Sequence, residues 1–283
     1  MSKGVLYVVA TPMGNLEDVT YRAIRVLQEV DLIAAEDTRQ TRLLLDRYAI
    51  RTPMLAFHEH NETARMPALL DRLSSGQGLA LVSDAGTPLI SDPGFPLVRE
   101  AIARGLKVVP IPGPCAAICA LSAAGLATDR FLFVGFPPRQ SGQRRRWLEA
   151  LARESATLIF YESSHRILNT LEEMQQLFGA NRQGVIAREL TKIHETFLFG
   201  NIAELLLGVT EDSNQQRGEF VLLVQGCEPR EEEQLNLDLD TLLRVLGEAL
   251  PVKQAASLAA SLTRYKKNDL YHRILKIRQG YGY

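Results

Sequence analysis

Three short segments rich in glycine and proline carry the residues of this sequence that are best suited to holding a ligand. They span 11–15, 83–94 and 112–116, and each follows an apolar run that is typical of a strand. Glycine lets a backbone approach a ligand closely, and the side chains of the second segment add hydroxyl and carboxylate groups. Any one segment alone is more typical of a tight turn, whereas three of them together favour a binding site.

Other patterns that carry well-known chemistry are absent. The sequence has no G-x-G-x-x-G after its first apolar run, no G-x-x-x-x-G-K-[ST] and no G-x-S-x-G, so dinucleotide binding, P-loop hydrolysis and a serine nucleophile elbow are unsupported. His58 and His60 lie on one side of an extended segment without a third ligand, so we expect surface polar residues there and no metal site. Three cysteines cannot form a disulfide framework, and this usage is typical of a cytosolic protein.

The elements that must position these segments alternate between strand and helix in the first half of the chain. Such repeats with short connections favour a mostly parallel sheet with helices on both faces. Because ligands bind beyond the carboxyl ends of parallel strands, we expect the three segments to share one sheet edge. The predicted strands span 5–10, 31–37, 79–84 and 107–112, and the helices span 20–30, 96–104 and 115–124, with another beginning at Asp37.

The second half predicts a mixed sheet, because several of its strands follow one another without an intervening helix. The predicted strands span 131–136, 157–163, 184–189, 194–200 and 219–226, and the helices span 164–178, 202–207, 239–250, 253–262 and 267–279. A polar, acidic linker separates the last three helices from the rest. We therefore expect an α/β fold with domains 1–125 and 126–227, followed by a helical module at 228–283.

The composition is that of an ordinary globular protein, with 46% hydrophobic and 23% charged residues. A length of 283 residues exceeds that of a typical single domain. Thirty-two basic residues against 33 acidic ones exclude a globally basic nucleic-acid coat. The uncharged segment 108–128 contains Pro110, Pro112 and Pro114, which would break a spanning helix, so we expect no membrane insertion.

Several of these stretches together resemble a known family. VATPMGNLEDVTYRAIRVLQEVDLIAAEDTR, VSDAGTPLISDPG and IPGPCAA are similar to the tetrapyrrole-methylase-type, class III S-adenosylmethionine-dependent methyltransferases. AAEDTRQT, FHEHNE, GFPPR, FYESSHR and ARELTKIHE resemble the branch that methylates the ribose 2′-oxygen of a cytidine in small-subunit (16S) ribosomal RNA. The resemblance covers about 4–225, and the basic helical tail also resembles that branch. Each motif is weak alone, and their shared order makes the resemblance specific.

The resemblance implies two α/β domains with S-adenosylmethionine folded into the cleft between them. It also implies a cytoplasmic homodimer that acts on ribosomal RNA or on the assembled small ribosomal subunit. The first loop lacks the extra glycines of the tetrapyrrole enzymes and the second is extended by 89–94, which points away from a porphyrin-like substrate. Carried over motif by motif, the cofactor-binding residues are Pro12, Ser83, Asp84, Gly86, Thr87, Ile90, Cys115, Ala116, Tyr161, Ala187 and Glu219.

Methyl transfer to a ribose hydroxyl is an in-line displacement that needs an oriented acceptor oxygen. A base that removes its proton, or a cation that stabilises the developing alkoxide, should lie nearby. The catalytic candidates are Asp37, Arg39, Glu189 and Lys192, with Glu36, Arg188 and His194 as alternatives. Structural roles are equally consistent, because Asp37 begins a helix with a capping-box pattern and Glu189 and Lys192 could form a surface ion pair.

RNA binding needs a positive surface, and two basic clusters could supply it. Residues 228–248 hold seven acidic and two basic side chains, whereas 253–278 hold seven basic and one acidic. The other basic cluster lies at 139–146, and Trp147, which follows it, could stack on a base. A charge run is often only a solvated helix face, and the resemblance favours the RNA interpretation. The predicted RNA-binding residues are Arg139, Arg144, Arg145, Arg146, Lys253, Arg264, Lys266, Lys267 and Arg273.

Three functions are therefore compared. The leading hypothesis is a ribose methyltransferase of small-subunit ribosomal RNA. The second is a small-molecule, tetrapyrrole-like methylase of the same fold, which would not need the basic tail. The third is a non-catalytic RNA-binding assembly factor that keeps the cofactor cleft as a relic.

Overall fold

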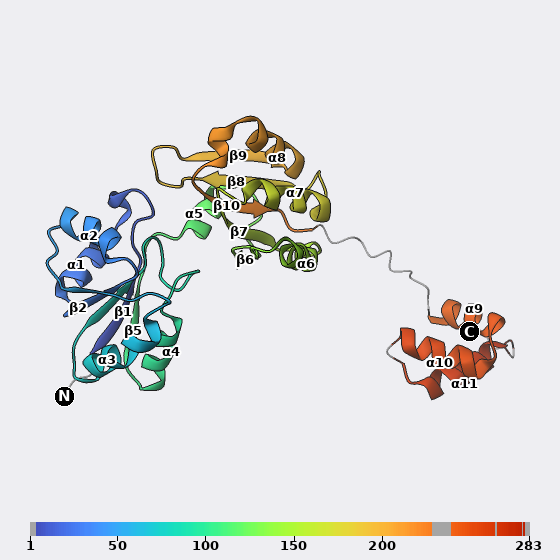
Figure 1. The fold of residues 1–283 in the computed structure, drawn as a ribbon. Coiled ribbons are helices and arrows are strands. Elements are labelled where there is room, and N and C mark those ends of the chain that lie inside the picture. Colours follow the sequence, from blue (N-terminus) through green and yellow to red (C-terminus); the bar gives the residue numbers. More distant parts are fainter. Residues whose placement is uncertain (1–3, 228–238, 264, 279, 281–283) are drawn as a thin grey trace. The chain divides into compact units, whose positions relative to one another are not determined.

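The computed structural model describes residues 4–227, 239–263, 265–278 and 280. The chain divides into two compact units, Met1–Cys227 and Glu228–Tyr283. The larger unit contains two five-stranded sheets, and we call the parts built on them the first lobe (β1–β5) and the second lobe (β6–β10) (Figure 1). Among the described residues, no helix combines the length and hydrophobicity needed to cross a bilayer.

The first lobe is an all-parallel sheet with the strand order β3-β2-β4-β1-β5. Its strands are β1 (Val5–Val9), β2 (Leu32–Ala35), β3 (Met54–Ala56), β4 (Leu79–Val82) and β5 (Lys107–Ile111). Its helices are α1 (Tyr21–Glu29), α2 (Thr38–Arg47), α3 (Glu62–Ser74) and α4 (Phe95–Ala103). A short 3-10 helix spans Leu16–Asp18. The predicted parallel α/β architecture is therefore confirmed.

Burial on both faces explains the continuous apolar runs of these strands. Ala35 and Val82 belong to a core cluster shared with α1 and α2, whereas their neighbours Ala34 and Leu81 pack with α3 and α4. Because side chains alternate along a strand, both registers must be apolar when helices cover both faces. The sheet is thereby fixed on both sides, and only its carboxyl edge is available for loops that bind a ligand.

The sequence interpretation missed β3 and α3. β3 has only three residues, all half-buried at the edge of the sheet, so it lacks the apolar run that marks the central strands. α3 contains Pro67, a residue that normally ends or kinks a helix. Its buried leucines, Leu69, Leu70 and Leu73, hold it against the sheet.

The second lobe is a mixed sheet with the order β6-β7-β10-β8-β9, in which only β6 and β7 run parallel. Its strands are β6 (Phe131–Gly135), β7 (Thr157–Ser163), β8 (Gln183–Arg188), β9 (Thr196–Asn201) and β10 (Glu219–Val224). Its helices are α6 (Ser141–Leu151), α7 (Ile167–Phe178) and α8 (Ile202–Glu211), with a 3-10 helix at Ser213–Gln216. The predicted mixed sheet is confirmed, and the arginine-rich stretch proves to be a helix.

Helix α5 (Ala116–Ala123) connects the two lobes. It follows β5 of the first sheet, yet its buried residues Ala117, Ala120 and Leu121 pack against β7, β8 and β10 of the second. Helices α6, α7 and α8 cover the opposite face of that sheet. The loop before α5 is therefore held between the two sheets.

In the described residues of the C-terminal unit there are three helices, α9 (Leu239–Ala249), α10 (Val252–Leu262) and α11 (Lys267–Arg278), as predicted. They share a small core of Leu243, Ala255, Ala256, Ala259, Leu270 and Ile274. A side chain at Gly247 would place its Cβ 3.1 Å from Ile274, so glycine lets α9 and α11 pack closely.

Candidate active site

The three glycine- and proline-rich loops meet at the carboxyl edge of the first sheet. Thr11 and Gly86 exchange two backbone hydrogen bonds, of 2.8 and 2.9 Å, which join the first loop to the second. The Thr87 hydroxyl donates to the Pro114 carbonyl at 2.9 Å and joins the second loop to the third. The parallel topology explains this meeting, because β4, β1 and β5 are neighbours in the sheet.

The second loop has an unusual backbone. Leu89 and Ser91 have φ angles of 72° and 75°, a left-handed conformation that is costly for residues with a side chain. Strain of this kind persists where surrounding contacts over-determine the chain, and it is common at binding sites. The loop therefore presents its main chain in a fixed, non-regular shape.

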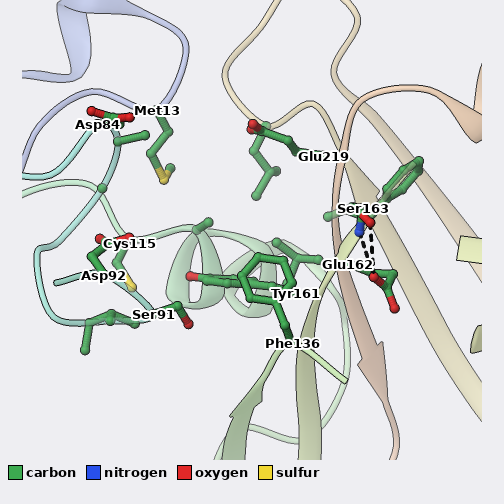
Figure 2. Close-up of a pocket in the computed structure, with 18 of the residues that line it drawn as sticks. Met13, Asp84, Ser91, Asp92, Cys115, Phe136, Tyr161, Glu162, Ser163 and Glu219 are labelled. Carbon is green, nitrogen blue, oxygen red and sulfur yellow. Dashed lines mark hydrogen bonds between the residues drawn. The ribbon is translucent and has the colours of Figure 1, made fainter. Parts of the chain in front are cut away.

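A cavity of about 490 Å³ lies between these loops and the second sheet (Figure 2). Met13, Asp84, Asp92 and Cys115 line it from the first lobe and Tyr161 faces them from β7. The remaining lining residues are Glu36, Ala85, Gly86, Thr87, Ile90, Ser91, Ala116, Phe136, Glu162, Ser163, Ser164, Ala187, Leu190, Gly218, Glu219, Phe220 and Val221.

An aromatic wall forms the side of the cavity that belongs to the second lobe. The Tyr161 ring packs edge-on against Phe133 and Phe136, with centroids 4.8 and 5.5 Å apart. Its hydroxyl accepts a hydrogen bond from the Ala117 N–H at 3.1 Å, at the start of α5. Burial raises the pKa of Tyr161 to about 12, and the nearby Cys115 adds to the shift, so the phenol stays protonated.

A largely buried ion pair holds the segment that follows Phe136. Arg166 donates to the carbonyls of Pro137 and Pro138, and its guanidinium lies 3.3 Å from a Glu162 oxygen. Glu162 also accepts from the Thr170 hydroxyl at 2.6 Å. This network ties the segment after β6 to β7 and α7.

The wall formed by the first lobe is acidic. Burial raises the pKa of Asp92 to about 6, and the negative charges of Glu36 and Asp84 add to the shift. Burial also raises the pKa values of Glu36 and Asp84. Crowded carboxylates at the wall of a half-buried cavity favour a ligand that carries positive charge.

Asp37 and Arg39 form a local structure at the start of α2. The Asp37 carboxylate accepts from the Arg39 N–H at 2.8 Å and pairs with its guanidinium at 2.6 Å. The hydrogen bond from Arg39 lowers the pKa of Asp37 to about 2. The predicted N-cap is therefore confirmed. Neither residue lines the cavity, although the Asp37 N–H donates to Asp84 at 2.8 Å.

Glu189 and Lys192 occupy a loop of the second lobe that reaches the first. Lys192 Nζ lies 2.8 Å from Glu189 and 3.0 Å from Glu219, so the predicted ion pair exists and has a third member. Burial alone would lower the pKa of Lys192, but hydrogen bonds to the two glutamates outweigh it and raise that pKa. Lys192 is therefore a cation near neutral pH.

Gly14 makes the contact between the two lobes sterically feasible. A Cβ atom at Gly14 would lie 2.4 Å from Lys192 Cγ and 3.0 Å from the Thr191 hydroxyl. That hydroxyl accepts from the Asn15 N–H at 3.2 Å. The first loop thus fits under the Lys192 side chain because position 14 has none.

A second cavity of about 410 Å³ adjoins the first. The two share Met13, Asp84, Ala85 and Glu219 as lining residues. The rest of the second cavity is lined by Thr11, Pro12, Gly14, Leu16, Gln40, Thr41, Leu43, Leu44, Ser83 and Lys192. Asp84 and Glu219 therefore stand where the two spaces meet.

The structure brings most of the predicted cofactor residues together. Nine of them line the first cavity: Asp84, Gly86, Thr87, Ile90, Cys115, Ala116, Tyr161, Ala187 and Glu219. Pro12 and Ser83 line the second cavity instead. Of the catalytic candidates, Lys192 lines the second cavity. Glu189 accepts a hydrogen bond from Lys192 and lines neither cavity.

Sequence reasoning overlooked Asp92, Phe136 and Leu190 as lining residues. All three stood inside motifs already singled out, so their positions were a usable signal. Leu190 resembled an ordinary core residue. Arg188 and His194, the alternative catalytic residues, lie outside both cavities, and the buried Arg188 donates to the Arg217 and His194 carbonyls.

The arginines of the first basic cluster, on and just before helix α6, differ in their exposure. Arg144 is 4% exposed and makes two 2.8 Å hydrogen bonds to Glu173, so we leave it out of any RNA-binding surface. Arg139, Arg145 and Arg146 are exposed. The Trp147 ring is partly buried and packs edge-on against Phe160, 5.7 Å away.

The C-terminal basic residues also differ from one another. Arg273 pairs with Asp240 at 2.6 Å and links α11 to α9. Lys253, Lys266 and Lys267 are exposed. Arg264 lies outside the described residues. The described part of the chain contains no group of three or more His, Cys, Asp or Glu side chains arranged for a metal ion.

Comparison with known proteins assigns the fold to one class. The family model of the tetrapyrrole (corrin/porphyrin) methylases matches residues 5–206. The methyltransferase CobJ has a TM-score of 0.60 at 20% identity, over 80% of this chain and 95% of that one. Uroporphyrin-III C-methyltransferase from Thermus thermophilus, solved with S-adenosylhomocysteine, has a TM-score of 0.56 at 19% identity, over 78% and 97%. The fold is that of a tetrapyrrole-type methylase.

Relatives that match along nearly the whole chain narrow this class. Ribosomal RNA small subunit methyltransferase I from Pseudomonas aeruginosa is 53% identical over 281 residues, 99% of both chains. The protein of that name from Pasteurella multocida is 51% identical over 268 residues, 95% of both. A model described as the RsmI C-terminal HTH domain matches residues 233–278. The chain therefore belongs to the ribosomal RNA small subunit methyltransferase I family within the tetrapyrrole methylases, and it is a methyltransferase.

The methyl donor of this family is S-adenosylmethionine, and the first cavity fits it. The donor has a sulfonium at its centre, an amino-acid end with an ammonium and a carboxylate, and an adenine at the other end. The carboxylates Asp84, Asp92 and Glu36 suit its sulfonium and ammonium groups, and the aromatic wall around Tyr161 suits its adenine. The volume lies in the usual range for ligand cavities.

Proposed function

We propose that this enzyme methylates the ribose 2′-oxygen of a cytidine in small-subunit ribosomal RNA. The near full-length similarity to relatives named ribosomal RNA small subunit methyltransferase I carries the choice of substrate RNA, and the ribose 2′-oxygen of a cytidine follows from the motif resemblance. The arrangement of charges at the junction of the two cavities supports it, because transfer to a hydroxyl needs a proton acceptor and stabilisation of developing negative charge.

The first cavity would hold S-adenosylmethionine, which supplies an electrophilic methyl group when bound. Asp92 and Glu36 would attract its sulfonium and ammonium groups, and the backbone of 86–91 would fix its methionine portion. Tyr161 and Phe136 would exclude water around the adenine of the donor. Orientation of this kind converts a bimolecular encounter into a reaction between positioned groups.

Asp84 is the group best placed to accept the hydroxyl proton. It lines both cavities, and one of its oxygens accepts from the Asp37 N–H, which fixes the carboxylate. Its pKa is raised by burial, which makes it a stronger base than an ordinary aspartate. Asp37, with its pKa near 2, is a poorer base and acts as the support of Asp84.

Lys192 would stabilise the alkoxide that develops as the proton leaves. Its ammonium is held at the second cavity by Glu189 and Glu219. Because these hydrogen bonds raise its pKa, it cannot act as the base, and its role is electrostatic.

The exposed basic residues of α6 and of the C-terminal unit would hold the RNA backbone, and we further propose a cytoplasmic homodimer. Ending the chain after Cys227 should weaken binding to small ribosomal subunits at least tenfold and leave donor affinity unchanged, because Lys253, Lys266 and Lys267 are lost. Filter binding and calorimetry measure the two affinities. An equal loss of both would contradict this division.

One assay tests the proposed function. The enzyme is incubated with radiolabelled S-adenosylmethionine and, in parallel, small ribosomal subunits, naked small-subunit RNA or porphyrinoids. We expect label in ribosomal RNA, at a ribose that then resists alkaline cleavage of its 3′ bond. Label only in porphyrinoids would indicate a small-molecule methylase, and binding of RNA without any transfer would indicate an assembly factor.

A further inference from the structure

We infer that the second cavity, between the first loop, α2 and Lys192, receives the acceptor nucleoside, with Thr41 as a residue that binds it. The inference rests on the proposed function, which it deepens by naming the place where one nucleotide, with its base and ribose, leaves the RNA strand and enters the enzyme. Enzymes that modify single nucleotides commonly take them out of the stack in this way.

The hydroxyl of Thr41 is the observation that points to a ligand. Thr41 is 5% exposed, lines the second cavity, and its Oγ1 atom has no hydrogen-bond partner among the described residues. A buried hydroxyl without a partner costs free energy, and proteins rarely retain one without a reason. The oxygen itself is buried, so a rotation of the side chain about χ1 would turn it toward the cavity, where a sugar hydroxyl or a base carbonyl would complete its hydrogen bonding.

The walls of the second cavity suit a nucleoside. Pro12, Leu16 and Leu44 offer apolar surface for a base, and Leu43 is 63% exposed beside them. The exposed carboxamide of Gln40, one residue before Thr41, can both donate and accept at a base edge. The volume of about 410 Å³ is within the usual range for small-molecule sites.

The position of the cavity suits the reaction. It shares Asp84 and Glu219 with the donor cavity, so a ribose at the shared edge would face the donor's methyl group. Lys192 lines the same space. Outside it, the exposed Arg39 and Arg42 lie on the same turn of α2 and could contact phosphates on either side of the bound nucleotide.

The test replaces Thr41 by valine, which has the same shape but no hydroxyl. We expect kcat/KM for small ribosomal subunits to fall about tenfold, mainly through KM, while calorimetric affinity for S-adenosylhomocysteine stays unchanged. The melting temperature should stay the same or rise, because an unsatisfied buried hydroxyl is removed. Thr41→Ser should restore most of the activity.

Thr210→Val is the matched control. The Thr210 hydroxyl donates to the Leu206 carbonyl on α8, away from both cavities, and its loss should not change kcat/KM. An unchanged kcat/KM in Thr41→Val, or a loss of donor affinity in proportion to activity, would overturn the inference. A lowered melting temperature without any change in KM would assign Thr41 a structural role.

A separate measurement distinguishes this inference from the proposed function. A cytidine-containing trinucleotide is titrated into the enzyme with S-adenosylhomocysteine present, and binding is followed by NMR. We expect binding to weaken in Thr41→Val and to recover in Thr41→Ser, even if no ribosomal substrate is methylated. Equal binding by wild type and Thr41→Val, or no binding by either, would refute the cavity assignment while leaving the methylation assay to decide the function.

Discussion

The two lobes contribute to the site by different means. The first lobe supplies main chain and carboxylates, through loops whose strained backbone is fixed by the neighbouring strands β4, β1 and β5. The second lobe supplies side chains, namely the aromatic wall around Tyr161 and the cation Lys192 held between two glutamates. We therefore expect substitutions in the first lobe to affect binding of the donor and of the acceptor nucleoside. Substitutions at Lys192 and on α6 of the second lobe should affect charge stabilisation and contacts to the flanking RNA.

The largest effect is expected at Asp84, where the first lobe would do chemistry as well as binding. Asp84→Asn should lower kcat about 1000-fold, because loss of a general base typically costs two to four orders of magnitude. Donor affinity should change by less than about tenfold. Single-turnover kinetics and calorimetry measure the two quantities. A fall in kcat smaller than about tenfold would leave Asp84 as a binding residue only.

Lys192 tests the second lobe in the same way. Lys192→Met should lower kcat about 100-fold, the scale of one lost electrostatic contact to developing charge, without weakening donor binding. Lys192→Arg keeps the cation and should retain more activity than the methionine variant. If both variants are equally inactive, the ion pairs with Glu189 and Glu219 serve the loop conformation and not the reaction.

The pH dependence of donor binding tests whether the acidic wall attracts the donor by its negative charge. Asp92 has a pKa of about 6, above its ordinary value of 3.8, so it gains a proton as the pH falls through 6. The ionised form attracts the positive donor, and affinity should therefore drop about tenfold between pH 7.5 and 5. Calorimetry should also show proton release on binding near pH 6.

Asp92→Asn should remove most of this pH dependence, and Asp129→Asn, an exposed carboxylate outside both cavities, should leave it intact. A pH profile identical in the wild type and Asp92→Asn would exclude Asp92 as the titrating group. Protonation of Glu36 or Asp84 would then have to explain any remaining change of donor affinity with pH.

The smallest effect is expected at Arg145, on the exposed side of α6. Arg145→Ala should weaken RNA binding about threefold and reduce the slope of log affinity against log salt by roughly one, because one phosphate contact is lost. Arg25→Ala removes an exposed arginine from α1 of the first lobe and serves as the control. Equal effects of the two variants would argue against an RNA surface on α6.

The sequence indicated the loops more reliably than the side chains that face them. Strong apolar runs identified the central strands and the parallel sheet, whereas the strand order came from the tertiary structure. The edge strand β3 was missed because three half-buried residues carry little periodic signal. Arg144 and Arg145 are adjacent and chemically identical, and only the helix phase decides that one is buried against Glu173 while the other is exposed.

The sequence by itself determined two α/β lobes, the parallel edge with its three loops, and the family, since these depend on local patterns and on the order of the motifs along the chain. Only the tertiary structure decided that Asp84 stands between two cavities, that Lys192 crosses above Gly14, and that the Thr41 hydroxyl is left without a partner. These facts join residues up to 178 positions apart in numbering, from 14 to 192, and no local pattern encodes such contacts. They arise because the packing of α5 against the second sheet brings the two lobes face to face.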